Sequence, residues 1–398
     1  MQQVDEAQNF LKRRHDRPGE VFKEIMRRDG LVVAMGVSSA LDTLAARAAK
    51  ENLEQGGGSC TFQAIYGGGW SKAASRGYPD MGFLTRQVMT DHLTNVVRAA
   101  FPMPVMGDAE TGYGDPKAVW QTVRDYHHAG VAVLHLEDQD DNRACGHAGG
   151  RSVVSAEVME AKLRSMRLEL QALDSSMLLL ARTDAVGAEN GDSGDSHPTV
   201  AIERGKRYMD AEVSGVRCAD MVWAEFKTPN PDVICAWVHA MRHHDPQMPL
   251  AINYSPNKEW ARWYQEHRPG EQPPSYADLH ELGYGFIFHT IPCARMVMEA
   301  VYTGARDFGQ NGAQALHDMQ RRQHGTWSGK PQAAVGMDRW QDYGILVGGE
   351  SAAQRLARAK KDIDLVKQRL LLEPKPAPGA DDPHKPLRSA IEKVDKAF

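Results

Sequence analysis

Eight short apolar runs recur along this 398-residue chain, and amphipathic segments separate most of them. Such runs, rich in β-branched and aliphatic residues, are typical of parallel strands buried on both faces. Eight strand–helix units in series predict an α/β fold, a (β/α)₈ TIM barrel. The predicted strands are Leu31–Val37, Phe62–Tyr66, Met103–Met106, Val131–Leu136, Met177–Ala181, Met221–Ala224, Pro249–Ile252 and Phe286–Phe288, and helical spacing marks Thr85–Ala99, Pro116–His128, Ala156–Leu173 and Thr199–Asp210.

Composition narrows the range of partners. A net charge of −5 without any basic block argues against nucleic-acid binding. The apolar runs are too short to span a bilayer and the N-terminus has no apolar signal segment, so we expect no membrane partner and a cytoplasmic location. The five cysteines are scattered without zinc-like pairing, which fits a reducing compartment.

The predicted barrel leaves segments at both ends of the chain. We expect an N-terminal extension over 1–20, the catalytic barrel over 21–292, a C-terminal helical region over 293–372, and a tail over 373–398 in which residues 387–398 could form a helix. Ala185–His197, rich in Gly, Asp and Ser, is interpreted as a mobile surface loop. Trp223, Trp237 and the Met-rich stretch Arg295–Ala300 are interpreted as core.

Polar residues follow the apolar runs at one end of the predicted barrel, where the functional side chains of such barrels lie. Asp108 and Glu110 are two apart, so an extended strand would point both to the same face. With Asp80 and Glu137 they form four carboxylates that repel one another unless a cation neutralises them. Oxygen ligands suit Mg²⁺, with Mn²⁺ as an alternative. The same acids could instead cap helices or pair with arginines.

Cys145 lies in a small, polar, glycine-rich segment over residues 142–151. Arg143 and His147 would favour its thiolate, the form that acts as a base. A flexible loop here could close over a substrate and exclude water. The alternative is an ordinary exposed thiol on a turn. The other four cysteines are interpreted as structural.

Three further groups could bind an anionic substrate. The planar guanidinium of Arg182 suits a substrate carboxylate, although it could merely neutralise Glu137 or Glu225. The glycines before Trp70 let backbone N–H groups approach an oxyanion, but they lack the spacing of a dinucleotide fingerprint. Neutral hydrogen-bonding residues that would suit a second carboxylate are Asn253, Ser255, Asn257 and Thr290.

From about residue 21 to residue 291 the chain resembles the isocitrate lyase/phosphoenolpyruvate mutase superfamily. The superfamily marker is a Lys-Lys-Cys-Gly-His or Lys-Arg-Cys-Gly-His loop after a Glu-Asp-Gln strand end. In this chain Glu137-Asp138-Gln139 precedes Arg143-Ala144-Cys145-Gly146-His147. Similar motifs in the same order are Asp108-Ala109-Glu110-Thr111-Gly112-Tyr113-Gly114, Ala181-Arg182-Thr183-Asp184-Ala185 and Asn253-Tyr254-Ser255-Pro256.

The resemblance implies a Mg²⁺-dependent homotetramer that exchanges C-terminal helices between subunits and cleaves a 2-hydroxytricarboxylate. It implies that Asp108 ligates the metal while Asp80, Glu110 and Glu137 hold its waters. It makes Cys145 the proton donor to carbon, with His147, Arg182 and Glu110 as further catalytic candidates. The substrate-binding residues it implies are Gly68, Gly69 and Trp70 at the glyoxylate end, Asn253, Ser255, Thr290, Gly146 and His147 at the succinate end, and Arg182 between them, with Glu225 and Asn257 as further candidates.

Isocitrate cleavage to glyoxylate and succinate, the glyoxylate-cycle reaction, is the expected activity because Asn253-x-Ser255-Pro256 and Thr290 look like isocitrate lyase. The alternative is 2-methylisocitrate cleavage to pyruvate and succinate, which the compact N-terminal region with Tyr78–Gly82 favours. One methyl group changes binding by only about 1–3 kcal/mol, so the sequence leaves both open. Oxaloacetate hydrolysis or decarboxylation and a non-catalytic dicarboxylate-binding relative are further alternatives. Three residues depart from the isocitrate lyase pattern: Gly68, Ala144 and Asn257.

Overall fold

The computed structural model describes residues 14–140 and 150–347, together with separate helical positions between 354 and 368. The predictions for Cys145, Gly146 and His147 and for the tail lie outside the described residues. The described residues divide into two compact units, one ending at residue 329 and the other starting at residue 330. The first unit contains the barrel, and the second contains α14 (Pro331–Ala334) and α15 (Met337–Leu346).

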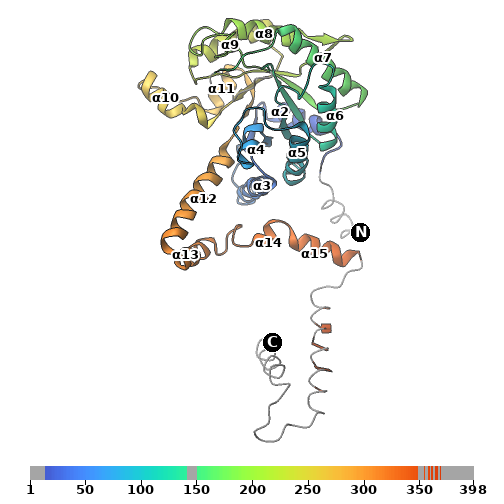
Figure 1. Cartoon of the computed structure of the whole chain (residues 1–398), viewed down its shortest axis with the longest axis vertical. Coiled ribbons are helices and arrows are strands. Elements are labelled where there is room, and N and C mark those ends of the chain that lie inside the picture. The colour runs from blue at the N-terminus through green and yellow to red at the C-terminus, as the bar shows by residue number, and fades with distance from the viewer. Residues whose placement is uncertain are drawn as a thin grey trace. The chain divides into compact units, whose positions relative to one another are not determined.

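The core of the first unit is a closed barrel of eight parallel strands, which confirms the predicted (β/α)₈ fold (Figure 1). Strands β1 and β10 pair with each other and close the ring. All eight predicted strands are confirmed to within three residues. In order around the barrel they are β1 (Val32–Val37), β10 (Tyr284–Phe288), β9 (Leu250–Asn253), β8 (Met221–Ala224), β5 (Leu178–Thr183), β4 (Val133–Glu137), β3 (Val105–Asp108) and β2 (Ala64–Gly67). A small antiparallel hairpin, β6 (Glu212–Val213) with β7 (Val216–Arg217), lies outside the ring.

Helices follow the strands and pack around the ring. Hydroxyl side chains begin four of the α-helices, because Ser39, Thr85, Ser155 and Ser275 each accept a hydrogen bond from a backbone N–H in the first turn. The predicted helix from Pro116 begins only at Trp120. The helices of this unit are α2 (Pro18–Asp29), α3 (Ala40–Gln55), α4 (Gly69–Ser75), α5 (Arg86–Ala100), α6 (Trp120–Ala129), α7 (Ala156–Ala172), α8 (Thr199–Asp210), α9 (Pro231–His244), the 3₁₀ helix η1 (Pro256–Lys258), α10 (Trp260–His267), α11 (Tyr276–Leu282), α12 (Pro292–Asn311) and α13 (Ala313–Gln323).

A layer of four aromatic side chains fills the barrel interior below the polar strand ends. Tyr66, His135, Trp223 and Phe288 come from β2, β4, β8 and β10, which are alternate strands of the ring. Their ring centroids are 4.8–5.8 Å apart around the layer. Layers of four side chains from alternate strands are the usual filling of such barrels. Two of the four, Tyr66 and His135, place polar atoms against Asp108, so this layer supports the candidate site as well as the core.

Helix α8 packs closely on α9 at Gly205, where a Cβ atom would lie 2.3 Å from the Trp237 ring and 2.8 Å from Met241 Sδ. Both neighbours are fully buried, which confirms Trp237 as core.

We expect Gly205→Ala to lower the free energy of unfolding by about 1–3 kcal/mol, measured by urea denaturation, because the Trp237 ring has no space into which to move. Gly304→Ala in α12, where a Cβ meets nothing within 4 Å, should instead stabilise by up to about 1 kcal/mol. Equal losses in both variants would contradict the packing argument.

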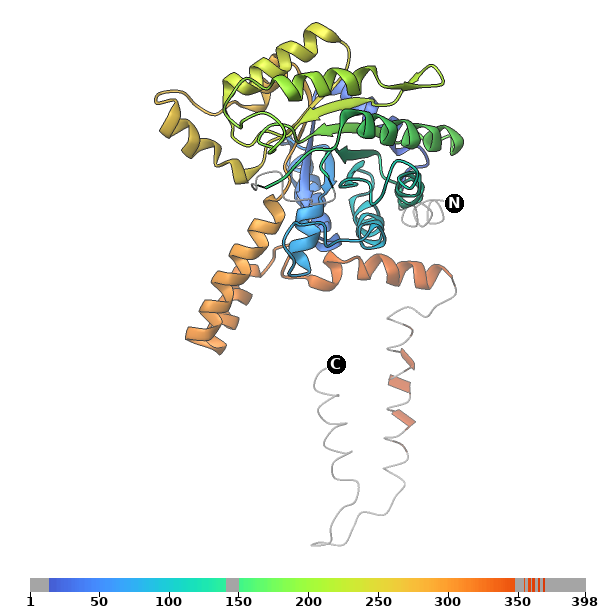
Figure 2. The same cartoon turned by 45° about the horizontal axis from the view of Figure 1, so that its top comes forward.

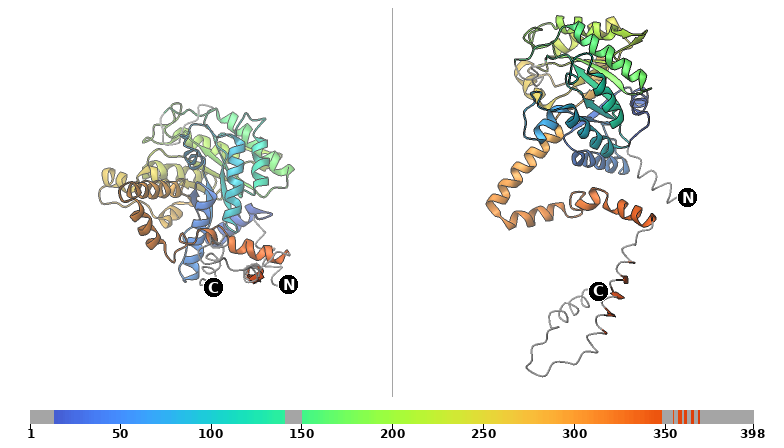
Figure 3. Two further views of the ribbon diagram at one scale, coloured as in Figure 1. Left: turned by 60° about the horizontal axis from the view of Figure 1, so that its bottom comes forward. Right: turned by 45° about the vertical axis from the view of Figure 1, so that its right-hand side comes forward.

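The Met-rich stretch of α12 is exposed, so its interpretation as core is wrong. Helix α12 runs away from the barrel (Figures 2 and 3), and Met296, Met298 and Tyr302 are 58%, 61% and 65% exposed. Helical spacing reports which residues share a face, but it does not report whether another element of the same chain covers that face.

The segment Ala185–His197, predicted to be a mobile loop, is fixed by hydrogen bonds in the structure. Both carboxylate oxygens of Asp192 accept from backbone N–H groups that begin α8, each at 2.9 Å. The Asn190 side chain both accepts from and donates to the backbone of Val153, at 2.9 Å each. Short polar side chains thus anchor this loop, although its composition resembles that of a flexible segment.

In the part of the chain that the structure describes, no helix is long and apolar enough to cross a membrane.

Candidate active site

Asp108, at the end of β3, is a carboxylate of the barrel mouth that accepts several hydrogen bonds. Its Oδ2 accepts from the Gly69 N–H at 2.8 Å and from the Tyr66 hydroxyl at 3.0 Å. Its Oδ1 accepts from the Glu110 N–H at 2.9 Å and lies 3.2 Å from His135 Nε2. The carboxylate is 3% exposed. Donors from β2, from the turn after β3 and from the start of α4, together with His135 on β4, therefore fix its orientation, as a metal ligand or a substrate-binding acid would require.

Glu110 lies beside Asp108 because the chain turns sharply after β3. Glu110 has a φ of 49°, a left-handed conformation that is uncommon for a residue with a side chain. A Cβ atom built on Gly69 would lie 2.9 Å from Asp108 Oδ2 and 3.0 Å from Glu110 Oε1. The two carboxylates thus approach one point, which glycine leaves open. The predicted pair is brought together at the mouth end of the barrel.

The other two predicted metal ligands do not join this pair in one cluster. Glu137 makes an ion pair with Arg182, and Asp80 lies half-buried between α4 and α5. Among the residues that the structure describes, no three His, Cys, Asp or Glu side chains are grouped closely enough to hold a metal ion. The hard oxygen donors of Asp108 and Glu110, converging beside Gly69, nevertheless fit Mg²⁺, which needs only one or two direct carboxylates.

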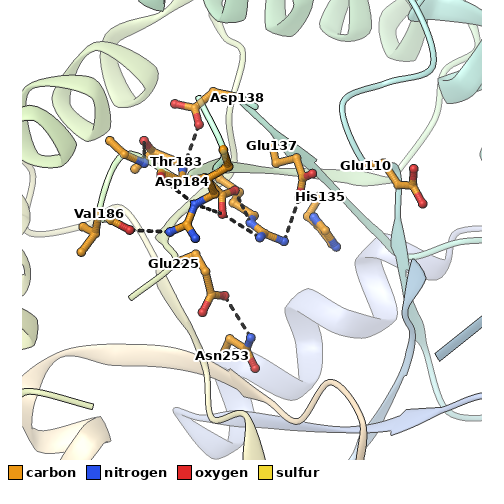
Figure 4. A network of polar contacts seen from close by, with 12 residues as sticks. Glu110, His135, Glu137, Asp138, Thr183, Asp184, Val186, Glu225 and Asn253 are labelled. Atoms are coloured by element: carbon orange, nitrogen blue, oxygen red, sulfur yellow. Dashed lines mark hydrogen bonds and ion pairs between the residues drawn. The ribbon is translucent and has the colours of Figure 1, made fainter. Parts of the chain in front are cut away.

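Arg182, at the end of β5, is the cation at the centre of the mouth. Its guanidinium lies 2.9 Å from Glu137 Oε2, donates to Asp184 Oδ1 at 2.8 Å, and stacks 4.3 Å above the Trp223 ring. Burial opposes its charge, but Asp184 and Glu137 together hold the pKa of Arg182 well above its usual value. Figure 4 shows Glu137, Asp184 and Glu225 gathered on one side of the mouth, with Glu110 apart from them. Arg182 thus neutralises Glu137, one of the two functions expected for it, and binding of a substrate carboxylate stays a prediction.

Asp138 and Arg151 both make hydrogen bonds to Asp184, the ion-pair partner of Arg182. Asp138 accepts from the Tyr208 hydroxyl at 2.7 Å, from Arg204 at 3.0 Å and from the Asp184 N–H at 2.8 Å. Arg151 is fully buried and donates to the carbonyl oxygen of Asp184 at 3.3 Å. Burial raises the pKa of Asp138 and of Asp184, and the arginines beside them oppose that rise. These contacts fix Asp184 beside Arg182.

The strands β8, β9 and β10 contribute the neutral side of the mouth. Thr290 Oγ1 donates to Ser255 Oγ at 3.3 Å, and the same oxygen accepts from the Asn257 N–H at 3.2 Å. Asn253 Nδ2 donates to Glu225 Oε2 at 2.9 Å, an interaction visible in Figure 4. Of the residues predicted to hold the succinate end, Asn253, Ser255 and Thr290 are therefore neighbours, whereas Gly146 and His147 lie outside the described residues. The backbone of Asn257 takes part in this group, and its side chain is exposed.

In the glycine segment after β2, a backbone N–H group donates a hydrogen bond into the barrel mouth. Gly69 begins α4, and its N–H points to Asp108 rather than to open space. A Cβ on Gly68 would lie 2.7 Å from the Tyr66 ring. The departure at Gly68 therefore has a physical basis, because a serine there would collide with Tyr66 in this arrangement. Trp70 is half-buried in the first turn of α4.

A family model described as phosphoenolpyruvate phosphomutase matches residues 22–308. The chain belongs to this family. The match spans the whole barrel and most of α12, which confirms the superfamily resemblance carried by the motifs.

Several lyases are among the proteins that this chain resembles. An isocitrate lyase of Haloferax volcanii is 31% identical over 302 residues, covering 76% of this chain and 78% of that protein. A probable 2-methylisocitrate lyase of Corynebacterium glutamicum is 30% identical over 287 residues, covering 71% and 80%. The solved 2,3-dimethylmalate lyase, described as a PEP mutase/isocitrate lyase superfamily member, matches with a TM-score of 0.64 at 22% identity, covering 84% and 96%. A phosphonopyruvate hydrolase solved with oxalate and Mg²⁺ matches with a TM-score of 0.57 at 20% identity, covering 74% and 88%.

Sequence reasoning missed four residues of this phosphomutase-family site: Tyr66, His135, Asp184 as the partner of Arg182, and Lys258. Tyr66 stands inside an apolar run and is indistinguishable from a core residue by pattern alone. A histidine inside the otherwise apolar stretch Val133–Leu136 was the available signal, because a buried histidine needs a polar partner. No sequence pattern indicated that Lys258 would be buried, because its burial depends on the turn after β9.

Proposed function

We propose that this protein is a Mg²⁺-dependent carbon–carbon lyase that cleaves isocitrate to glyoxylate and succinate. The observation that carries the proposal is the division of the barrel mouth into an acidic side, Asp108 with Glu110, and a neutral hydrogen-bonding side, Asn253 with Ser255 and Thr290, on either side of Arg182. A 2-hydroxytricarboxylate has groups that match both sides. The 31% identity to an isocitrate lyase agrees with this match.

Asp108 and Glu110 would hold the metal together with water, and Glu137 and Asp80 are the further candidates. The phosphonopyruvate hydrolase that shares the fold was solved with Mg²⁺, which supports this choice of cation. A bound Mg²⁺ supplies Lewis-acid stabilisation of negative charge on the substrate's hydroxycarboxylate oxygens.

The protein's own groups would then divide the acid–base work. The Glu110 carboxylate, or that of Glu137, accepts the proton of the substrate 2-hydroxyl group as the carbon–carbon bond breaks. Arg182 holds a substrate carboxylate by charge-assisted hydrogen bonds. Hydrogen bonds from Asn253, Ser255 and Thr290 strengthen as charge builds on the departing succinate. Cys145 delivers a proton to the succinate carbon from the opposite face.

A comparison of substrates tests this proposal against its nearest alternatives. We expect a higher kcat/KM for isocitrate than for 2-methylisocitrate, oxaloacetate or 2,3-dimethylmalate, each measured with Mg²⁺. One methyl group accounts for only about a 10–200-fold preference. A higher kcat/KM for 2-methylisocitrate would reassign the activity to that lyase, and cleavage of none of the four would favour the non-catalytic relative.

We also propose a homotetramer in which α12 and α13 pack on neighbouring subunits. The exposed apolar side chains of α12 support this arrangement, since exposed apolar side chains gathered along one element are typical of a protein–protein interface. They are Met296, Val297, Met298, Val301 and Tyr302.

A further inference from the structure

Lys258 is a buried lysine at the neutral side of the barrel mouth. It ends η1, and its side chain is only 1% exposed. The ammonium lies 3.0 Å from Glu225 Oε1 and donates to the carbonyl oxygen of Asn253 at 3.0 Å. Burial lowers the pKa of Lys258, while Glu225 opposes that shift. A lysine is almost never buried to this degree unless a partner compensates its charge, and here the partner is Glu225.

Glu225 is in turn held at both oxygens. Its Oε1 faces Lys258, and its Oε2 accepts from Asn253 Nδ2 at 2.9 Å. The carboxylate is 1% exposed at the end of β8, and Arg182 is close enough to interact with it electrostatically. Lys258 therefore contributes a positive charge next to Glu225, and Asn253 helps to orient its carboxylate.

The same lysine belongs to the turn that presents Ser255. The Lys258 N–H donates to the carbonyl oxygen of Ser255 at 3.2 Å, and the indole N–H of Trp260 donates to that oxygen at 3.1 Å. Ser255 Oγ accepts a hydrogen bond from the Thr290 hydroxyl. The Lys258–Glu225 ion pair thus ties the turn after β9 to the end of β8, across the side of the mouth that would receive the succinate carboxylate.

We propose that Lys258 is a positioning residue that sets specificity: by neutralising Glu225 it allows a substrate carboxylate to occupy the subsite of Asn253, Ser255 and Thr290. The proposal rests on the proposed function, because it names the group that this subsite receives. A substrate carboxylate near an unneutralised buried Glu225 would meet like-charge repulsion with little solvent screening. With Lys258 present, the pair is neutral, and Arg182 and the hydroxyl groups determine the interaction with the anion.

The test measures succinate binding by calorimetry, together with KM and kcat for isocitrate, in the full-length protein with Mg²⁺. We expect Lys258→Met to raise the Kd for succinate and the KM by about tenfold or more, with a smaller change in kcat. Lys23→Met is the matched control, because it removes a lysine paired with Glu20 at 3.3 Å on α2, which packs on Phe286 inside the barrel through Phe22. It should leave Kd and KM within about twofold of the parent values.

A second variant separates neutralisation of Glu225 from direct contact with the substrate. Adding Glu225→Gln to Lys258→Met removes both charges and should bring Kd and KM back toward the parent values. In the Glu225→Gln background alone, Lys258→Met should change Kd by less than about threefold, a comparison that holds even where the single Lys258 variant fails to fold. An unchanged Kd in Lys258→Met, or a double variant as weak as the single one, would overturn the proposal.

Failure of the inference and failure of the proposed function give different results. Succinate binding is read without turnover, so a parent protein that binds succinate but cleaves no substrate contradicts the lyase proposal and leaves the Lys258 test in force. A parent protein that cleaves isocitrate while Lys258→Met keeps its KM and Kd contradicts the Lys258 inference alone.

Discussion

The Asp108→Asn variant is expected to lose roughly three orders of magnitude in kcat, the loss expected when a charge-stabilising group is removed at about 4 kcal/mol. An amide keeps the size of the side chain but removes the negative charge that would hold Mg²⁺ beside Glu110. The Gly69 and Glu110 N–H groups, which donate to Asp108 at 2.8 and 2.9 Å, would also lose a charged acceptor. Steady-state kinetics with Mg²⁺ titration measures the loss.

Its control is Asp115→Asn. Asp115 is exposed and accepts from the backbone N–H groups of Lys117 and Ala118, a role that asparagine can also fill. We expect this variant to keep the parent kcat and the parent Mg²⁺ dependence. Because the Asp108 carboxylate is buried, Asp108→Asn should also lower the free energy of unfolding by about 1–3 kcal/mol, measured by denaturant titration. An Asp108→Asn protein with parent-like kcat and Mg²⁺ affinity would remove this carboxylate from the metal site.

Cys145→Ser is expected to lower kcat by about 10²–10⁴-fold, the usual contribution of a positioned acid or base. Serine has nearly the same shape, but its hydroxyl ionises far less readily than a thiol. Mg²⁺ binding should be unchanged, because Asp108 and Glu110, the residues proposed to hold the metal, are unaltered in this variant. Calorimetry with Mg²⁺ and steady-state kinetics on the same sample separate the two effects.

Cys60→Ser provides the matched control for the thiol. Cys60 is half-buried before β2, where its Sγ contacts the Phe62 carbonyl oxygen at 3.5 Å, a contact that a hydroxyl can make. This variant should keep the parent kcat. Near-parent kinetics in Cys145→Ser, or an equal loss in both variants, would exclude Cys145 as the proton donor.

The strands and the edge on which the site lies could be predicted because each depends on local pattern. An unbroken apolar run such as Met177–Ala181 has no polar face, so it must be buried on both sides. Parallel strands place the residues that follow them at one end, which is why Asp108, Arg182 and Asn253 were expected on the same side of the barrel. Their order along the chain sufficed for that inference.

The partners within the site could not be predicted because they depend on register across strands. Glu137 faces Arg182 since the two residues are paired across β4 and β5, and Tyr66 reaches Asp108 from β2. Lys258 turns inward only because η1 follows β9. The exposure of Met296 and Met298 is likewise a property of the surroundings of α12 rather than of its sequence. The same amphipathic pattern would fit a helix covered by its own chain or by another copy.

The most direct test of the account measures the products formed from isocitrate, with metal removed by EDTA and with Mg²⁺ restored. We predict equal amounts of glyoxylate and succinate when Mg²⁺ is present, no product with EDTA, and recovery when Mg²⁺ is added back. Product formation that EDTA leaves unchanged would contradict the metal site at Asp108 and Glu110. Absence of both products with Mg²⁺ present would contradict the isocitrate lyase activity itself.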